Sequence, residues 1–109
     1  MILTFSPVRM DATLTASVEG DVLTLNGEAL DFGPLPSGAT LPRAAIDCIW
    51  VSGDVTRDSD GTLTVPLILP HGGNAPAQTL FPAPLAASDG PVDLPPYNAP
   101  AEVPADVEN

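Results

Sequence analysis

Apolar and polar residues alternate between residues 12 and 32, which is the period of a strand with one buried face. Two dipeptides, Gly20-Asp21 and Asn26-Gly27, interrupt this pattern with residues that favour two-residue hairpin turns. The pattern therefore predicts a three-stranded antiparallel meander. The turns set apolar residues opposite each other in the pairs Ala16 with Leu25, Val18 with Leu23, and Leu23 with Leu30. The residues predicted to face the core are Leu14, Val18, Leu23, Leu25, Leu30 and Phe32.

A second hairpin is predicted from residues 45–57 and 62–69, which are rich in β-branched and aromatic side chains. The polar turn 58–61 joins these two strands. Pro66 has no N–H to donate to a ladder, so it indicates either an edge strand or a bulge. Gly53, on the partner strand, is the expected bulge position.

The segment between the two hairpins is broken by proline and glycine. Residues 33–38 are predicted to form a loop. Residues 41–45 are predicted to form one helical turn, with Thr40 as its N-cap and Pro42 near its start.

Proline also shapes the C-terminal third of the chain. Residues 70–76 are predicted to be an irregular loop, and residues 79–85 to lie extended across the sheet. Residues 92–94 are predicted to add a last short strand. From Pro95 onward the chain is rich in proline and acid, a composition typical of a disordered, semi-extended tail. The predicted organisation is thus a β domain over 1–94 and a disordered acidic, Pro-rich tail over 95–109.

These elements place the chain in the all-β class. The predicted architecture is a small antiparallel sandwich or rolled sheet of about six to seven strands, followed by the disordered tail. The edge strands of such a domain need protection from pairing with other chains. We expect the acidic charge and the prolines at 66, 70, 82 and 84 to supply that protection.

Charge is the strongest compositional bias. Fourteen acidic residues face three arginines and no lysine, which gives a formal net charge of −11. A field of this sign repels nucleic-acid phosphates and anionic lipids, so neither nucleic acid nor a membrane is an expected partner. The charge favours solubility and can attract a basic protein partner.

The N-terminal residues are not expected to form a secretory signal. Met1 to Phe5 are mostly apolar, but Ser6-Pro7 interrupts them and no basic start precedes them. The sequence also has no apolar run of the roughly 20 residues that a membrane helix needs. The expected location is the cytoplasm after synthesis, unless a larger particle carries the protein out.

Cys48 and His71 are the only residues of their types and the first candidates for catalysis. A single cysteine cannot form an intrachain disulfide, and Cys48 lies in an apolar run that is typical of a small core residue. Its use as a nucleophile would need a nearby base, and the spacing does not link it to His71. His71-Gly72-Gly73 resembles an oxyanion loop, but no Gly-x-Ser-x-Gly nucleophile motif accompanies it. We therefore predict no catalytic site and no cofactor.

Asp54, Asp58 and Asp60 suggest a calcium site near Gly61. An EF-hand loop with glycine at its sixth position would place Thr56 first and Leu67 twelfth, where calcium ligands are required. Turn formation by the Asp-Ser-Asp-Gly sequence accounts for the same residues. A calcium-binding or carbohydrate-binding β domain is therefore kept as the alternative function, with these three aspartates as its metal candidates.

Leu80, Phe81 and Tyr97 are the candidate partner-binding residues. They lie on the segment 79–97, which can present apolar side chains to another protein. Pro95-Pro96-Tyr97 is similar to the core of peptides bound by small proline-recognition domains. The sequence lacks the spacer residue that the full motif places between proline pair and tyrosine, so a linker role is the better interpretation.

Four stretches of the chain, and its acidic Pro-rich end, carry a family resemblance. They are Met-Ile-Leu-Thr-Phe-Ser-Pro-Val-Arg at 1–9, Leu-Asn-Gly-Glu-Ala-Leu-Asp-Phe at 25–32, Ile-Leu-Pro-His-Gly-Gly-Asn-Ala-Pro at 68–76, and Phe81-Pro82. Over residues 1 to about 97 the chain resembles a family of short uncharacterised proteins encoded among the tail genes of alphaproteobacterial phages and prophages. The resemblance implies a setting in a phage tail and association with the virion, and no activity.

The leading hypothesis is a non-enzymatic structural or interaction module. The resemblance implies a minor tail component or assembly adaptor whose partners are phage tail subunits. The contact would be a sheet edge or the segment 79–97. A third hypothesis, a small hydrolase that uses His71, is weaker because no nucleophile motif is present.

Overall fold

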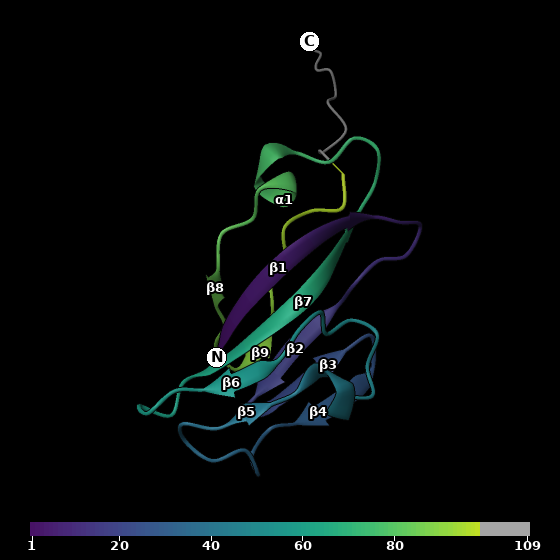
Figure 1. Ribbon diagram of the computed structural model, residues 1–109. Coiled ribbons are helices and arrows are strands. Elements are labelled where there is room, and N and C mark those ends of the chain that lie inside the picture. Colours follow the sequence, from purple (N-terminus) through teal and green to yellow (C-terminus); the bar gives the residue numbers. More distant parts are fainter. Residues whose placement is uncertain (99–109) are drawn as a thin grey trace.

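A computed structural model describes residues 1–98, which form nine strands in two sheets (Figure 1). The first sheet has the strand order β5-β6-β7-β1-β8, and the second has the order β4-β3-β2-β9. The strands are β1 (Ile2–Arg9), β2 (Ala16–Glu19), β3 (Val22–Leu25), β4 (Glu28–Asp31), β5 (Thr40–Leu41), β6 (Val55–Arg57), β7 (Leu63–His71), β8 (Leu85–Ala86) and β9 (Gly90–Pro91). The prediction of mostly β structure is confirmed. The predicted strand number was too low, because three of the nine strands have only two residues and carry no recognisable sequence pattern.

The meander of β2, β3 and β4 has the predicted register. Val18 pairs with Leu23, Ala16 with Leu25, and Leu23 with Leu30. Asn26 and Gly27 both have positive φ, as a type I′ turn requires. The first strand begins at Ala16 and not at residue 12, because the backbone and side chain of Asn26 bind the segment before it.

Asn26 fixes the entry into the meander. Its Oδ1 accepts a hydrogen bond from the Thr15 backbone N–H at 2.7 Å, and its Nδ2 donates to the Thr13 carbonyl at 3.0 Å. Its φ of 49° is one that asparagine tolerates better than most residues. Asn26 therefore has two roles: its backbone forms the turn, and its side chain binds the segment that leads into β2.

We expect Asn26→Ala to lower the free energy of unfolding by about 2 kcal/mol, because it loses both hydrogen bonds and strains the left-handed backbone. Asn26→Gly loses the same hydrogen bonds without that strain, so it should cost only about 1 kcal/mol. Urea unfolding followed by the fluorescence of Trp50 measures both values. Equal losses in the two variants would show that the backbone conformation at residue 26 carries no strain.

The prediction of a purely antiparallel fold is wrong for the first sheet. β1 runs parallel to β7 along its full length, from Ile2 opposite Thr64 to Arg9 opposite His71. These two strands form the centre of the sheet, although the sequence between them contains the whole meander. Such a pair requires a long connection, and in this fold the connection includes β2, β3 and β4 of the second sheet.

The second predicted hairpin is present but interrupted. β6 pairs with β7 at Thr56 opposite Thr64, while Val51 bridges Leu67. If the register of β6 and β7 continued unchanged, residue 53 would lie opposite Leu67. Val51 takes that place, so the chain before β6 contains two extra residues and bulges opposite Pro66. The prediction of a bulge is confirmed. The edge-strand alternative for Pro66 is wrong, because β7 lies inside the sheet with β1 on its other side.

The loop 33–38 and the predicted helical turn are present, with one correction. A 3-10 helix, η1, covers Arg43–Ala45, and Pro42 occupies its N-cap position. Thr40 does not cap it, because Thr40 belongs to β5 and pairs with Thr56. Asp54 takes that role from across the sheet, since its Oδ1 accepts a hydrogen bond from the Arg43 N–H at 2.8 Å.

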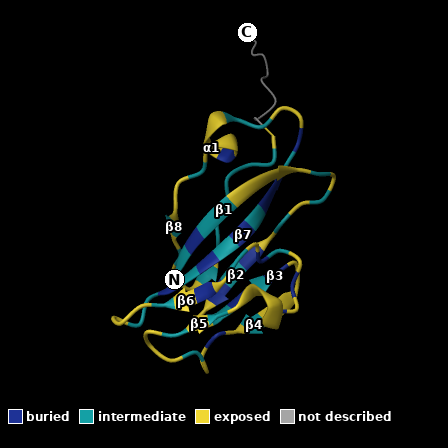
Figure 2. Ribbon diagram, viewed as in Figure 1, coloured by how far each residue is buried: buried dark blue, intermediate teal, exposed yellow. Residues whose placement is uncertain are grey.

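Both sheets contribute to one hydrophobic core (Figure 2). Leu3, Val65 and Leu67 from the first sheet and Leu23 and Leu25 from the second are fully buried. Predicted core residues Val18 and Phe32 are buried as well, and Leu14 and Leu30 pack against the core while partly exposed. The apolar alternation of the meander thus identified its buried face correctly.

The C-terminal part differs from the prediction in two places. Residues 79–85 are not extended throughout, because one α-helical turn, α1 (Ala77–Leu80), precedes β8. The last strand is β9 at Gly90–Pro91, not residues 92–94, although the Val92 N–H still donates to the Ala16 carbonyl. The predicted tail divides into two parts. Residues 95–98 bond to the body of the domain, as described below, and residues 99–109 lie outside the described residues.

Candidate functional site

An apolar surface lies where α1 ends. Phe81, the residue after α1, has 82% of its surface exposed, and its neighbour Leu80 has 39% exposed. Both were predicted as partner-binding candidates from the sequence. Figure 1 shows the chain leading from α1 to β8, which pairs with β1. Ile49, which is 69% exposed, is another exposed apolar residue, but it belongs to the segment before β6.

A hollow with a volume of about 410 Å³ lies next to the segment that carries Leu80 and Phe81, since Gln78 and Ala83 of this segment line it. Phe5 of β1, Gln78 of α1 and Leu85 of β8 line it from three elements. Asp93 contributes an exposed carboxylate, and Leu94 a partly buried apolar side chain. The lining is therefore mixed, with apolar walls and one acidic group, which suits an amphipathic side chain more than a purely apolar one.

Residues 95–98 hold the other wall of this hollow in place. The buried Thr79 hydroxyl of α1 donates a hydrogen bond to the Pro96 carbonyl at 2.6 Å. The Gly72 N–H donates to the Tyr97 carbonyl at 2.9 Å, and the Tyr97 hydroxyl donates to the Met10 carbonyl. Tyr97 was a predicted partner-binding residue. Since its hydroxyl and carbonyl are both engaged within the domain, it serves as an anchor of the chain.

Asn98 extends this attachment by one residue. Its Oδ1 accepts a hydrogen bond from the Asn74 N–H at 3.0 Å. A Cβ atom on Gly72 would collide with the same oxygen, so glycine at position 72 lets the two segments approach. Gly72 therefore has a packing role in this structure.

Among the described residues, one edge of β1 is largely unpaired. β8 pairs only with Ile2 and Leu3, whereas β1 continues to Arg9. The side chains from Ser6 to Arg9 are exposed. This edge was not identified from the sequence. The available signal was Pro7, because proline inside a strand is typical of an edge.

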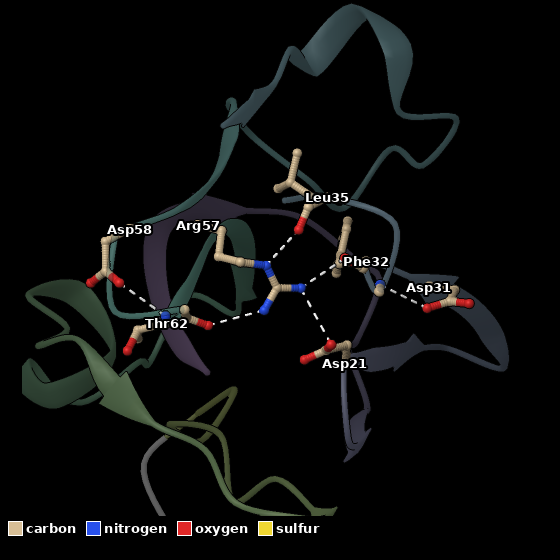
Figure 3. A network of polar contacts seen from close by, with 9 residues as sticks. Asp21, Asp31, Phe32, Leu35, Arg57, Asp58 and Thr62 are labelled. Carbon is tan, nitrogen blue, oxygen red and sulfur yellow. Dashed lines mark hydrogen bonds and ion pairs between the residues drawn. The ribbon is translucent and has the colours of Figure 1, made fainter. Parts of the chain in front are cut away.

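The most buried charged side chain of residues 1–98, Arg57, belongs to a separate network (Figure 3). Its guanidinium donates to the carbonyls of Leu35 at 2.6 Å, Phe32 at 2.9 Å and Gly61 at 3.0 Å. It also pairs with the half-exposed Asp21 carboxylate at 3.3 Å. These contacts engage each of its nitrogens, so Arg57 holds the loop 33–38 against both sheets and is not available to a ligand. No pattern in the sequence points to Arg57, because three of its four partners are backbone carbonyls and two of these belong to a distant segment.

Two of the three candidate calcium ligands, Asp54 and Asp58, have their carboxylates engaged in local structure. Asp54 binds the start of η1, and the Oδ1 of Asp58 accepts hydrogen bonds from the N–H groups of Asp60 and Thr62 at 2.9 Å each. The turn interpretation of the Asp-Ser-Asp-Gly sequence agrees with these bonds. Within residues 1–98, no group of three or more histidine, cysteine or acidic side chains is placed to hold a metal ion.

Cys48 and His71 are not linked by a hydrogen bond in the described part of the chain. Cys48 is 6% exposed and belongs to the main core, as expected for a small apolar residue. His71 ends β7, and its Nδ1 lies 2.9 Å from the Gly72 carbonyl. The geometry therefore brings together no nucleophile and base at these positions.

In residues 1–98 no helix has the length and apolar character needed to cross a membrane. Comparison with known proteins adds no further constraint on the site. No family model matches the sequence, and neither a curated protein nor a solved structure is detectably similar to it.

Proposed function

We propose that this protein is a non-enzymatic interaction module that binds a partner protein through the surface formed by Leu80, Phe81 and the adjacent hollow. The observation that carries this proposal is the 82% exposure of Phe81, on a segment whose residues Gln78 and Ala83 line the hollow. A large aromatic side chain that folding leaves in water gains free energy when a partner buries it. The two sheets, which share one core, act as a small sandwich scaffold for this surface.

Hydrogen bonds within the domain hold the segment around Leu80 and Phe81 in place, which supports a role in binding. Thr79 fixes α1 to residue 96, and the Tyr97 carbonyl is bonded to Gly72. The helical turn before Phe81 is therefore attached to residues 96–97, and the chain after Phe81 is attached through the pairing of β8 with β1. A preformed surface loses less conformational entropy on binding than a mobile one.

The setting we propose is a phage or prophage tail, in which the module acts as a minor component or assembly adaptor. Its support is the resemblance in the stretches 1–9, 25–32 and 68–76 and in Phe81-Pro82. The partner is then a tail subunit. This setting makes the lysate of a phage-producing host the appropriate source of partners.

The test is affinity capture of tagged protein from that lysate, with mass spectrometry of the retained proteins. We expect Phe81→Ser to lose a partner that the wild-type protein retains, because it removes the largest exposed apolar group. Ile49→Ser is the matched control, since Ile49 is also an exposed apolar residue but lies before β6. Retention of the partner by Phe81→Ser, or equal loss in both variants, contradicts the proposal.

A further inference from the structure

We propose that the partner of this module binds as an added β-strand along the unpaired edge of β1, from Thr4 to Arg9, and places a lysine or arginine side chain in the hollow beside Phe5. This inference rests on the proposed function and specifies its binding mode. Strand addition to a free sheet edge is a recurrent way of recognising an extended peptide.

The direction of the backbone groups of β1 follows from two hydrogen bonds at its ends. The Ala87 N–H donates to the Met1 carbonyl at 2.8 Å, on the β8 side. The Met10 N–H donates to the His71 carbonyl at 3.2 Å, on the β7 side. Because neighbouring residues of a strand direct these groups to opposite sides, the odd-numbered residues of β1 face β8.

Beyond Leu3, the backbone groups of the odd-numbered residues therefore face an edge that β8 leaves unpaired. Phe5 and Arg9 offer both an N–H and a carbonyl there, and Pro7 offers a carbonyl only. Pro7 is tolerated in the strand because its missing N–H would point to this open side and not to β7. The edge presents two donors and three acceptors, enough for a short added strand.

The hollow lies where the ladder with β8 would continue. Leu3 pairs with Leu85, so the next outward-facing pair would be Phe5 with Ala83. Both of these residues instead line the hollow, which means that the chain before β8 has turned away from β1. The space beside Phe5 is thus open next to unpaired backbone groups.

Charge identifies the partner as basic. Asp93 lines the hollow, and the whole chain carries a net charge of −11. A lysine or arginine can lay its apolar stem on Phe5 and Leu94 while its charged end reaches Asp93. A second copy of this chain does not fit this role, because two molecules of such negative charge repel each other.

The direct test uses a synthetic peptide of alternating threonine and valine with a central lysine, and the same peptide with glutamate at that position. We expect the lysine peptide to bind at least about tenfold more tightly at low salt, by fluorescence anisotropy. Asp93→Asn should reduce that preference several-fold. Hydrogen exchange of the Phe5 and Arg9 amides should slow when the peptide is added. Equal binding of the two peptides, or unchanged exchange at both amides, overturns the inference.

A pair of variants separates the binding mode from the proposed function. Arg9→Pro removes the outward N–H of residue 9, and Arg9→Ala removes the same charge but keeps that N–H. We expect Arg9→Pro to bind the lysine peptide about tenfold more weakly than Arg9→Ala. Thermal unfolding of both variants checks that they remain folded. If Phe81→Ser loses the lysate partner while Arg9→Pro retains it as Arg9→Ala does, the interaction module stands and strand addition is wrong.

Discussion

Replacing Arg57 with methionine should lower the free energy of unfolding by about 3 kcal/mol and the melting temperature by roughly 10–20 °C. Methionine keeps an apolar stem of similar length but removes every donor of the guanidinium. The carbonyls of Phe32, Leu35 and Gly61 then lose their partner in a site where the arginine side chain is only 11% exposed. An unsatisfied buried acceptor costs more than the lost bond contributed.

Two further substitutions identify which part of the Arg57 network matters. Arg57→Lys keeps the charge but not the planar fork, so we expect about half of the loss seen with methionine. Asp21→Asn should cost less than about 1 kcal/mol, because the Asp21 side chain is 47% exposed and its ion pair is well solvated.

Urea unfolding, followed by Trp50 fluorescence and by circular dichroism, measures these losses. Arg43→Met is the matched control, since Arg43 is exposed and its side chain does not enter the core. A loss at Asp21 as large as that at Arg57 would show that stability depends on the ion pair and would contradict the dominant role of the carbonyl contacts.

Leu67→Ala should have a comparable effect, with a loss of about 3 kcal/mol. Leu67 is fully buried in the middle of β7, where it pairs with Phe5 of β1 and bridges Val51. Removing its side chain creates a cavity on the central strand, and strands on both sides limit how far the core can close around it.

The control for this cavity is Leu67→Met, which keeps the volume and should cost less than about 1.5 kcal/mol. Differential scanning calorimetry of the three proteins measures the order of stability. Equal losses of stability in the alanine and methionine variants would show that the core closes around the cavity. The neighbouring β1 and the Val51 bridge would then not hold the core open at Leu67.

The local parts of the fold were predictable because their determinants are adjacent in sequence. Gly20-Asp21 and Asn26-Gly27 fix the register of the meander within a few residues of each strand, and the alternation of apolar residues selects its buried face. Pro66 indicated a bulge by its residue type alone, because proline has no N–H to donate to a β-ladder.

The non-local parts were not predictable from these patterns. The segment Ile2–Arg9 has only a partial alternation, and nothing in it specifies a parallel partner as distant as β7. β8 and β9 pair over two residues each, which is too short for any periodicity. Sequence composition also assigned residues 95–98 to a tail, although hydrogen bonds from Gly72, Asn74 and Thr79 hold them on the domain.

The candidate site was half predictable. Leu80 and Phe81 could be named because they lie on an apolar segment that prolines interrupt, which can present its side chains to another protein. The hollow and the free edge of β1 depend on where β8 turns away, which no local pattern specifies. Arg57 was missed because the chain supplies its partners from residues 21, 32, 35 and 61, and backbone carbonyls leave no trace in a sequence.

The parallel pairing of β1 with β7 determines when the first sheet can assemble during translation. Among the nine strands of residues 1–98, β1 is synthesised first, and its partner β7 is synthesised only after the whole meander. Until then β1 has neither neighbour, whereas the meander can form from contacts between adjacent residues. Until β7 has been synthesised, the nascent chain therefore exposes both edges of β1, which makes this strand a site for aggregation or for chaperone binding.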